Sequence, residues 1–179
     1  MPDGSTRLNL KKTEVNFDEI FEAALYLIEF MNRQEAGFDG FAGFSQGMQL
    51  VIALYKVHRY FSKDTWLRYP LPYFVIDFNA PVHNLGTFEY LRSSFVTGER
   101  YVPDVDSLHF ISDKDMFASQ LINHKNFDNP TVIHHDQGHR PVRTLPMKDL
   151  KIVADFLVRQ FQTRNKAIEE AEPIISAFY

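Results

Sequence analysis

Apolar residues in the first third of the chain follow a helical period, then a strand-like run, then a helical period again. A first helix is expected from Asn16, which opens the segment N-F-D-E as a cap, with Glu19 three residues further on. One face of this helix carries apolar residues at helical spacing, namely Ile20, Ala24, Leu27, Ile28 and Met31. The helix should end near Gly37. An apolar strand over residues 38–44 and a helix over residues 46–60 are expected next.

The remainder of the chain continues this alternation. Short apolar runs predict strands at residues 73–78, 107–111 and 131–135. Helical spacing predicts short helices at residues 88–95 and 116–127, and a last helix with Pro146 in its first turn. The buried stripe of that last helix should consist of Leu150, Val153, Ala154, Leu157, Val158 and Phe161.

This order of elements predicts one folded domain. Residues 1–15 are polar and have no period, so they are expected to form an N-terminal extension. The domain should cover residues 16–166, and residues 167–179 should form a C-terminal tail with an acidic turn and an apolar tip. Strands that alternate with helices predict an α/β fold with a mostly parallel sheet flanked by helices.

The sharpest chemical signal is a Gly-x-Ser-x-Gly motif formed by Gly43, Ser45 and Gly47. It lies between an expected strand and an expected helix, which is the setting of a nucleophile elbow. In such a turn a side chain at either glycine is expected to collide with its surroundings. The following helix directs free amide groups and a partial positive charge at the serine. A serine that only caps the helix between two glycines is the plain alternative.

Two further polar residues follow later strands of the expected sheet. Asp115 comes after S-L-H-F-I-S-D-K, and His139 comes after T-V-I-H-H-D-Q-G. Reactive groups in a parallel sheet gather at the carboxyl ends of the strands. The chain order Ser, Asp, His is that of the α/β-hydrolases. Ser45 would then be the nucleophile, His139 the base and later the acid, and Asp115 the group that orients the imidazole.

Each of these residues also has a simpler interpretation. Asp115 and its neighbour Asp113 suit a helix cap, and His139 suits a surface loop. His134, His135 and His139 together form H-H-x-x-x-H, which leaves a metal site as an alternative. Helical spacing would bring His135 and His139 together, but D-Q-G after a strand-like run opposes a helix there. A metal site would also need a further ligand beside these two, which is not evident from the sequence. We therefore expect no metal and no other cofactor.

Composition narrows the range of partners and locations. The 179 residues contain no Cys, which excludes disulfides and thiolate metal sites. A net charge of -4 argues against nucleic acid as the main partner. No run of 18 apolar residues exists, so no membrane span is expected. The start, M-P-D-G-S-T-R-L, lacks the apolar region of a secretory signal, so an intracellular, cytoplasmic location is expected, with an organelle left open.

Three motifs together resemble the fungal-type serine hydrolases (FSH domain), a family that includes the ovarian-tumour-suppressor-like hydrolases. These motifs are F-D-G-F-A-G-F-S-Q-G, S-L-H-F-I-S-D-K-D and H-H-D-Q-G-H-R-P-V, and the resemblance runs from about Phe17 to Phe161. It implies an α/β-hydrolase fold and esterase or thioesterase-like activity on acyl esters. It also implies that Ser45 is the nucleophile, Asp115 the acid and His139 the base.

The sequence departs from the family pattern at three places near these motifs. Gln137 stands where the family's G-G-H has its first glycine, and Ser112 stands where a glycine is common. The segment N-A-P, which begins at Asn79, stands where the family has S-G-F. These changes leave the three candidate residues in place and bear on the shape of the pocket.

The resemblance further implies an N-terminal segment with an H-G motif, which the residues before Asn16 do not show. In that family one oxyanion donor is the amide after the nucleophile, here Gln46, and the other comes from the loop after the H-G strand. Losing one such donor typically costs about 10²–10³ in rate. We therefore expect a truncated α/β-hydrolase that acts on acyl esters or thioesters weakly or not at all.

The alternative is a non-catalytic structural subunit of a larger assembly built on the same fold. In both cases the strand over residues 38–44, F-D-G-F-A-G-F, would be the edge of the sheet. An unpaired strand edge invites pairing with another chain. A protein partner or self-association is therefore expected from Phe38 through Phe44.

Overall fold

The computed structural model describes residues 17–60, 66–80, 105–116, 124–125 and 127–176. The expected helix over residues 88–95 and the expected extension over residues 1–15 lie outside the described residues. The expected helix over residues 116–127 lies mostly outside them as well.

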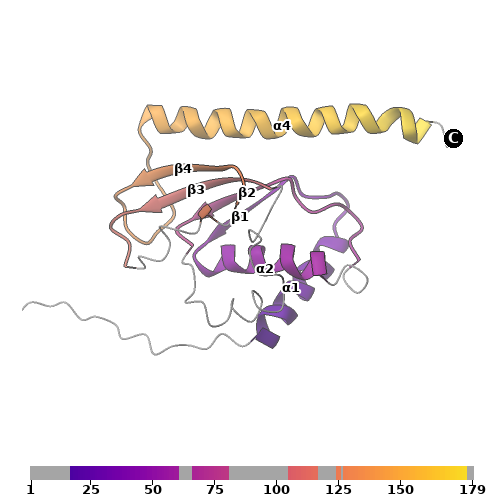
Figure 1. Cartoon of the computed structure of the whole chain (residues 1–179), viewed down its shortest axis with the longest axis horizontal. Coiled ribbons are helices and arrows are strands. Elements are labelled where there is room, and N and C mark those ends of the chain that lie inside the picture. The colour runs from indigo at the N-terminus through magenta and orange to yellow at the C-terminus, as the bar shows by residue number, and fades with distance from the viewer. Residues whose placement is uncertain (1–16, 61–65, 81–104, 117–123, 126, 177–179) are drawn as a thin grey trace, which may run out of the picture.

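The first four described elements alternate between helix and strand, as the sequence predicts, and two further strands and a last helix follow them (Figure 1). Their bounds are α1 Phe17–Asn32, β1 Gly40–Phe44, α2 Gln46–Tyr60, β2 Phe74–Phe78, β3 Asp106–Ser112, β4 Pro130–His135 and α4 Met147–Ser176. The four strands form one parallel sheet in the order β1-β2-β3-β4. Because all four strands run in the same direction, their carboxyl ends meet at one edge of the sheet.

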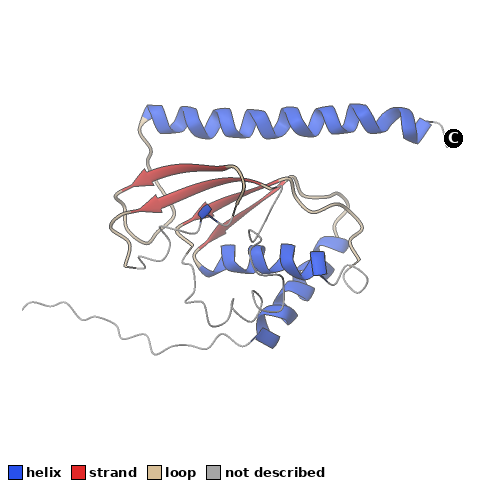
Figure 2. Cartoon of the chain, in the orientation of Figure 1, coloured by secondary structure: helices blue, strands red, loops and turns tan. Residues whose placement is uncertain are grey.

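Helices cover both faces of this sheet (Figure 2). α1 and α2 lie on one face and α4 lies on the other. Strand β3 is buried along almost its whole length, and its buried residues include the polar Ser107, His109 and Ser112 as well as apolar residues. The described helices are also too short or too polar to cross a membrane.

α1 ends at Asn32, five residues before the glycine that the sequence suggested as its end. The side chain of Asn32 donates to the Trp66 carbonyl at 2.8 Å and accepts from the Arg68 amide at 2.7 Å. These two hydrogen bonds connect the end of α1 to the loop before β2, and the chain turns toward β1 after Asn32.

The last helix differs from expectation in its length and in the face that it buries. α4 continues to Ser176, so the acidic turn expected from residue 167 is part of the helix. Phe156 is fully buried against Phe74 of β2, with ring centroids 5.7 Å apart. Val153 and Leu157 pack beside it, as expected.

The other four members of the expected stripe are exposed. Leu150, Val158 and Phe161 are 45%, 52% and 50% exposed, and Ala154 is exposed as well. α4 carries apolar residues on two adjacent faces, and the helical period alone does not say which of them meets the sheet. The buried face is the one that carries Phe156, because its large ring packs against the aromatic side chains of Phe74 and Phe110 in the sheet.

The two glycines of the turn after β1 play different structural roles. A Cβ at Gly43 would lie 2.6 Å from the backbone N and Cα of Met48, so a side chain there is sterically excluded. A Cβ at Gly47 would meet nothing within 4 Å. The expectation that both positions exclude a side chain is therefore wrong for Gly47, which lies in the first turn of α2 and faces open space.

This contrast predicts opposite outcomes for two equivalent substitutions. Gly43→Ala should lower the free energy of unfolding by about 1–3 kcal/mol, because the helix backbone has to move away from β1. Gly47→Ala should leave stability within about 1 kcal/mol of wild type, since alanine is a better helix former than glycine. Chemical denaturation of both variants measures this, and equal losses would contradict the different packing of the two sites.

Candidate active site

Ser45 occupies a strained turn between β1 and α2. Its backbone φ is 53°, in the left-handed region that residues other than glycine rarely adopt. The turn is held from both sides, because the Ser45 amide donates to the Phe78 carbonyl at 3.0 Å and the Ser45 carbonyl accepts from the Met48 amide at 3.3 Å. Such conformations cost about 1–3 kcal/mol and persist only where the surrounding structure imposes them.

The structure brings Ser45, His139 and Asp115 into one hydrogen-bonded chain. Ser45 Oγ lies 3.0 Å from His139 Nε2, and His139 Nδ1 lies 2.7 Å from Asp115 Oδ2. The Asp115 side chain is fully buried, whereas that of His139 is 17% exposed. A proton on Nδ1 that is donated to the carboxylate leaves Nε2 able to accept the serine proton.

Each partner is placed by the end of a different strand. The Asp115 amide donates to the Ser112 carbonyl at 3.1 Å, which forms a turn directly after β3. His139 lies in the loop after β4, and its ring packs against Phe44 at a centroid distance of 4.9 Å. Gln46 is the first residue of α2, so its amide has no partner within the helix. Its role as an oxyanion donor stays a prediction.

The other two histidines of the H-H-x-x-x-H segment have partners of their own. His134 Nδ1 lies 3.4 Å from Asp113 Oδ1 at the surface. His135 lies 3.2 Å from Asn79 Oδ1 through Nε2, and its Nδ1 accepts from the Gln137 amide at 3.2 Å. Within the described ranges, no group of three or more His, Asp or Glu side chains has the arrangement to hold a metal ion.

A second Asp–His–Ser chain, which sequence reasoning missed, lies inside the sheet. His109 Nδ1 is 2.9 Å from Asp77 Oδ2, and His109 Nε2 is 2.9 Å from Ser107 Oγ. All three residues are buried, so no substrate can reach the hydroxyl. The signal in the sequence was one polar residue in the apolar run of β2, Asp77, and two polar residues among the apolar ones of β3, Ser107 and His109. The same order of hydrogen-bonded Asp, His and Ser side chains therefore occurs at two places in the described structure. The two differ in exposure, because the His139 side chain is partly exposed whereas all three residues of the second chain are buried.

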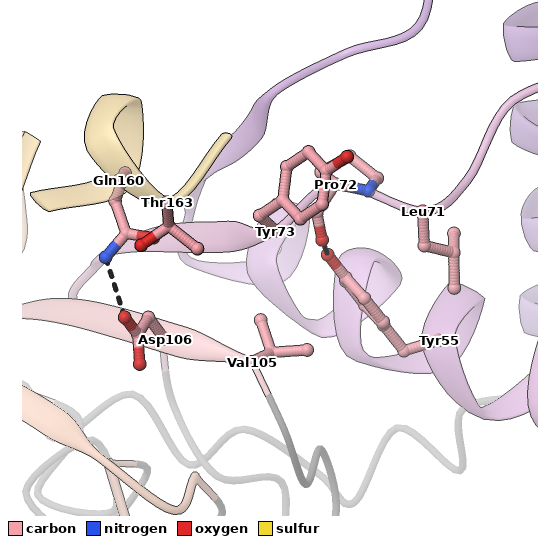
Figure 3. Close-up of a pocket in the computed structure, with 8 residues that line it drawn as sticks. All are labelled: Tyr55, Leu71, Pro72, Tyr73, Val105, Asp106, Gln160 and Thr163. Atoms are coloured by element: carbon pink, nitrogen blue, oxygen red, sulfur yellow. Dashed lines mark hydrogen bonds between the residues drawn. The ribbon is translucent and has the colours of Figure 1, made fainter. Parts of the chain in front are cut away.

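A cavity of about 460 Å³ lies at the other end of the sheet (Figure 3). It is lined by Tyr55, Leu71, Pro72, Tyr73, Val105, Asp106, Gln160 and Thr163. Figure 3 shows the Gln160 side chain donating to Asp106, at 2.7 Å, beside this cavity. Because Asp106 begins β3 while Ser45 follows the end of β1, this cavity is not the place where an acyl group would meet the serine.

Comparisons with known proteins bear on the family and the fold of this chain. The family described as serine hydrolase (FSH1) matches residues 7–149. No curated protein sequence matches the chain. Among solved structures, the acyl-protein thioesterase 2 of Zea mays is similar with a TM-score of 0.55 and 13% identity, over 80% of this chain and 65% of that one. The chain thus spans slightly less than two thirds of the maize protein.

Human thioesterase 2 is a second similar structure. It has a TM-score of 0.47 and 15% identity, over 91% of this chain and 93% of that one. At 13% identity the likeness to the maize protein concerns the fold, and it confirms the expected α/β-hydrolase architecture.

The environment of His135 predicts how stability depends on pH. Burial lowers the pKa of His135 below its ordinary value of 6.5, and His134 acts in the same direction. Three carboxylates oppose this shift, namely Asp136, Asp115 and Asp113. A histidine with a lowered pKa binds its proton more weakly in the folded state than in the unfolded state. Its contribution to stability is therefore present above pH 6.5 and is lost as the pH falls through the lowered value.

Melting temperature should accordingly fall between about pH 7.5 and about pH 5, and part of this fall should disappear in His135→Asn. Asparagine keeps an oxygen near the position of Nδ1, so it can still accept from the Gln137 amide, but it does not titrate. His124, whose pKa is also lowered by burial, should account for part of the slope that is left. Identical pH slopes in wild type and His135→Asn would contradict the assignment.

Proposed function

Because the chain belongs to the serine hydrolase family described as FSH1, we propose that it hydrolyses acyl esters or thioesters through an acyl-enzyme on Ser45. The observation that carries the proposal is the hydrogen-bonded chain from Ser45 through His139 to the buried Asp115. The left-handed turn at Ser45 supports it, since a serine that only caps a helix needs no such strain.

In the proposed reaction His139 Nε2 takes the proton of Ser45 Oγ while the oxygen attacks the acyl carbonyl. Asp115 holds the imidazole by Nδ1 and stabilises the imidazolium that forms. The amide of Gln46, at the positive end of α2, donates to the oxyanion. His139 then returns the proton to the leaving alcohol or thiol, and water releases the acid from Ser45 by the same steps in reverse roles.

The surface beside the serine supports an acyl substrate. Phe44 is 37% exposed and its ring lies against His139, so an apolar surface adjoins the reacting atoms. The acyl group of an ester can bury part of its chain there, whereas a charged group gains nothing from it. The name of the similar maize structure, an acyl-protein thioesterase, points to the same substrate class.

A fluorophosphonate probe tests the nucleophile directly. We expect wild-type protein to be labelled and Ser45→Ala to stay unlabelled, and His139→Gln to be labelled far more slowly. Wild-type protein should also hydrolyse p-nitrophenyl acetate, and Ser45→Ala should not, because the acyl-enzyme needs the serine oxygen. Labelling that persists in Ser45→Ala would refute the choice of nucleophile, and folded protein that is never labelled would favour a non-catalytic role.

A second candidate function is that of a structural subunit that pairs with another chain at β1. Within the described sheet, β1 pairs with β2 on one side, and Ala42 and Phe44 are exposed on the face that α4 covers elsewhere. Phe161 and Ile168 are also exposed. They lie three residues before and four residues after Arg164, which reaches Asp39 just before β1 at 2.9 Å. The exposed stripe of α4 therefore faces the same side of the molecule as the β1 edge.

The aromatic residues before and within β1 support this candidate only in part. Phe38 is half-buried and stacks between Phe30 and Phe41 at centroid distances of 6.2 Å. Phe41 also contacts Tyr55 of α2 edge-on at 6.4 Å. These rings are shielded by their own chain, so any partner would contact Phe44 and the stripe of α4 instead.

Self-association provides the test of this second candidate. Light scattering should then give a mass above the 20.9 kDa of one chain. The double substitution Val158→Glu and Phe161→Glu should shift the mass toward the monomer, because it places charge in a buried apolar contact. Lys148→Glu, an exposed position on the same helix that points away from Phe161, is the matched control and should have no effect. A monomer at every concentration that also unfolds cooperatively would count against a structural role at this edge.

A further inference from the structure

Asn79 lies directly after β2 in a conformation that its sequence neighbours do not explain. Its φ is 52°, and the residue is almost completely buried. Asparagine tolerates the left-handed region better than most residues, yet the conformation still needs support from its surroundings. The Asn79 amide donates to the Phe110 carbonyl of β3 at 3.0 Å, which fixes the residue at the carboxyl edge of the sheet.

The side chain of Asn79 joins β3 to the loop that carries His139. Its Oδ1 accepts from the Ser112 amide at 3.0 Å, at the end of β3. Its Nδ2 donates to the Arg140 carbonyl at 2.7 Å and, at 3.5 Å, approaches the Gly138 carbonyl. These contacts fix which end of the amide is oxygen, because a backbone N–H must meet an acceptor and a carbonyl must meet a donor.

Ser112 makes the complementary connection. Its Oγ accepts from the Gly138 amide at 3.0 Å and from the Lys114 amide at 3.3 Å. Its carbonyl accepts from the Asp115 amide at 3.1 Å. Ser112 is buried as well, so water does not compete for these bonds. One residue therefore fixes the backbone of the acid and the residue next to the base.

We infer that Asn79 and Ser112 are positioning residues for His139. Their hydrogen bonds to the backbone on both sides of the histidine keep its ring aligned with Asp115 and Ser45. This inference rests on the proposed function for its catalytic meaning, but its structural content concerns the contact between His139 and Asp115. Both side chains act through the backbone of residues 138 and 140. Their loss should disturb the alignment of the imidazole and leave the binding of substrate unchanged.

Two substitutions test this inference. Asn79→Asp keeps an acceptor for the Ser112 amide and tolerates the same φ, but it loses the donor to the Arg140 carbonyl. Ser112→Ala removes the acceptor of the Gly138 amide with a minimal change in volume. Asn32→Asp is the matched control, since Asn32 makes the same two-sided contact with Trp66 and Arg68 at the end of α1.

Kinetics on p-nitrophenyl acetate give the first readout. We expect kcat to fall by up to about 10²-fold in Asn79→Asp and Ser112→Ala, with KM unchanged, because a small misplacement of a catalytic group is costly. Asn32→Asp should retain the wild-type kcat. A wild-type kcat in folded Ser112→Ala, or a raised KM with kcat unchanged, would overturn the inference. If Asn79→Asp does not fold, Ser112→Ala alone decides.

Proton NMR gives a second readout that needs no catalysis. The proton that His139 Nδ1 shares with Asp115 should give a far-downfield resonance, which His139→Asn would identify by its loss. We expect this resonance to weaken or disappear in Asn79→Asp and Ser112→Ala and to persist in Asn32→Asp. If wild-type protein shows the resonance but no hydrolysis, the proposed function fails while the positioning role stands. If both variants keep the resonance, the positioning role fails.

Discussion

The close approach of α2 to β1 is the contact on which the rest of the candidate site depends. Gly43 has no side chain, and the backbone of Met48 occupies the space where a Cβ would lie. This approach forces the chain to reverse within the turn between them and leaves Ser45 in the left-handed conformation. The hydroxyl is thereby presented at the carboxyl edge of the sheet, where the loops after β3 and β4 bring Asp115 and His139. A side chain at Gly43 would push α2 away from β1 and displace the Ser45 hydroxyl from the other two residues.

The sequence predicted those features of the fold that depend on local pattern. The alternation of helix and strand, the bounds of α2 and the parallel sheet follow from periodicity, since apolar spacing reports directly which side of an element is buried. The meeting of Ser45, Asp115 and His139 followed from placing each of them after a strand of one parallel sheet. That argument holds because parallel strands carry their carboxyl ends to one edge.

Features that depend on contacts between distant segments were not predictable in this way. The buried face of α4 was misjudged because the helix has two apolar faces, and only the fit of Phe156 against the sheet chooses between them. In the sequence, Asn79 and Ser112 are visible only as departures from a family pattern. Their hydrogen bonds join segments up to 61 residues apart, and no local spacing reports such a contact. The same applies to the buried chain of Asp77, His109 and Ser107.

The left-handed backbone at Ser45 has a consequence for how this chain can change over evolutionary time. Glycine adopts such a φ without penalty, so a serine in that place carries a standing cost to the fold of about 1–3 kcal/mol. Native domains are stable by only about 5–15 kcal/mol, which makes such a cost a noticeable fraction of the whole. A descendant that no longer needed the hydroxyl would gain by replacing it with glycine. Selection for stability therefore acts against a serine at this position, as it does not at an unstrained surface serine, and only a requirement for the hydroxyl opposes that selection.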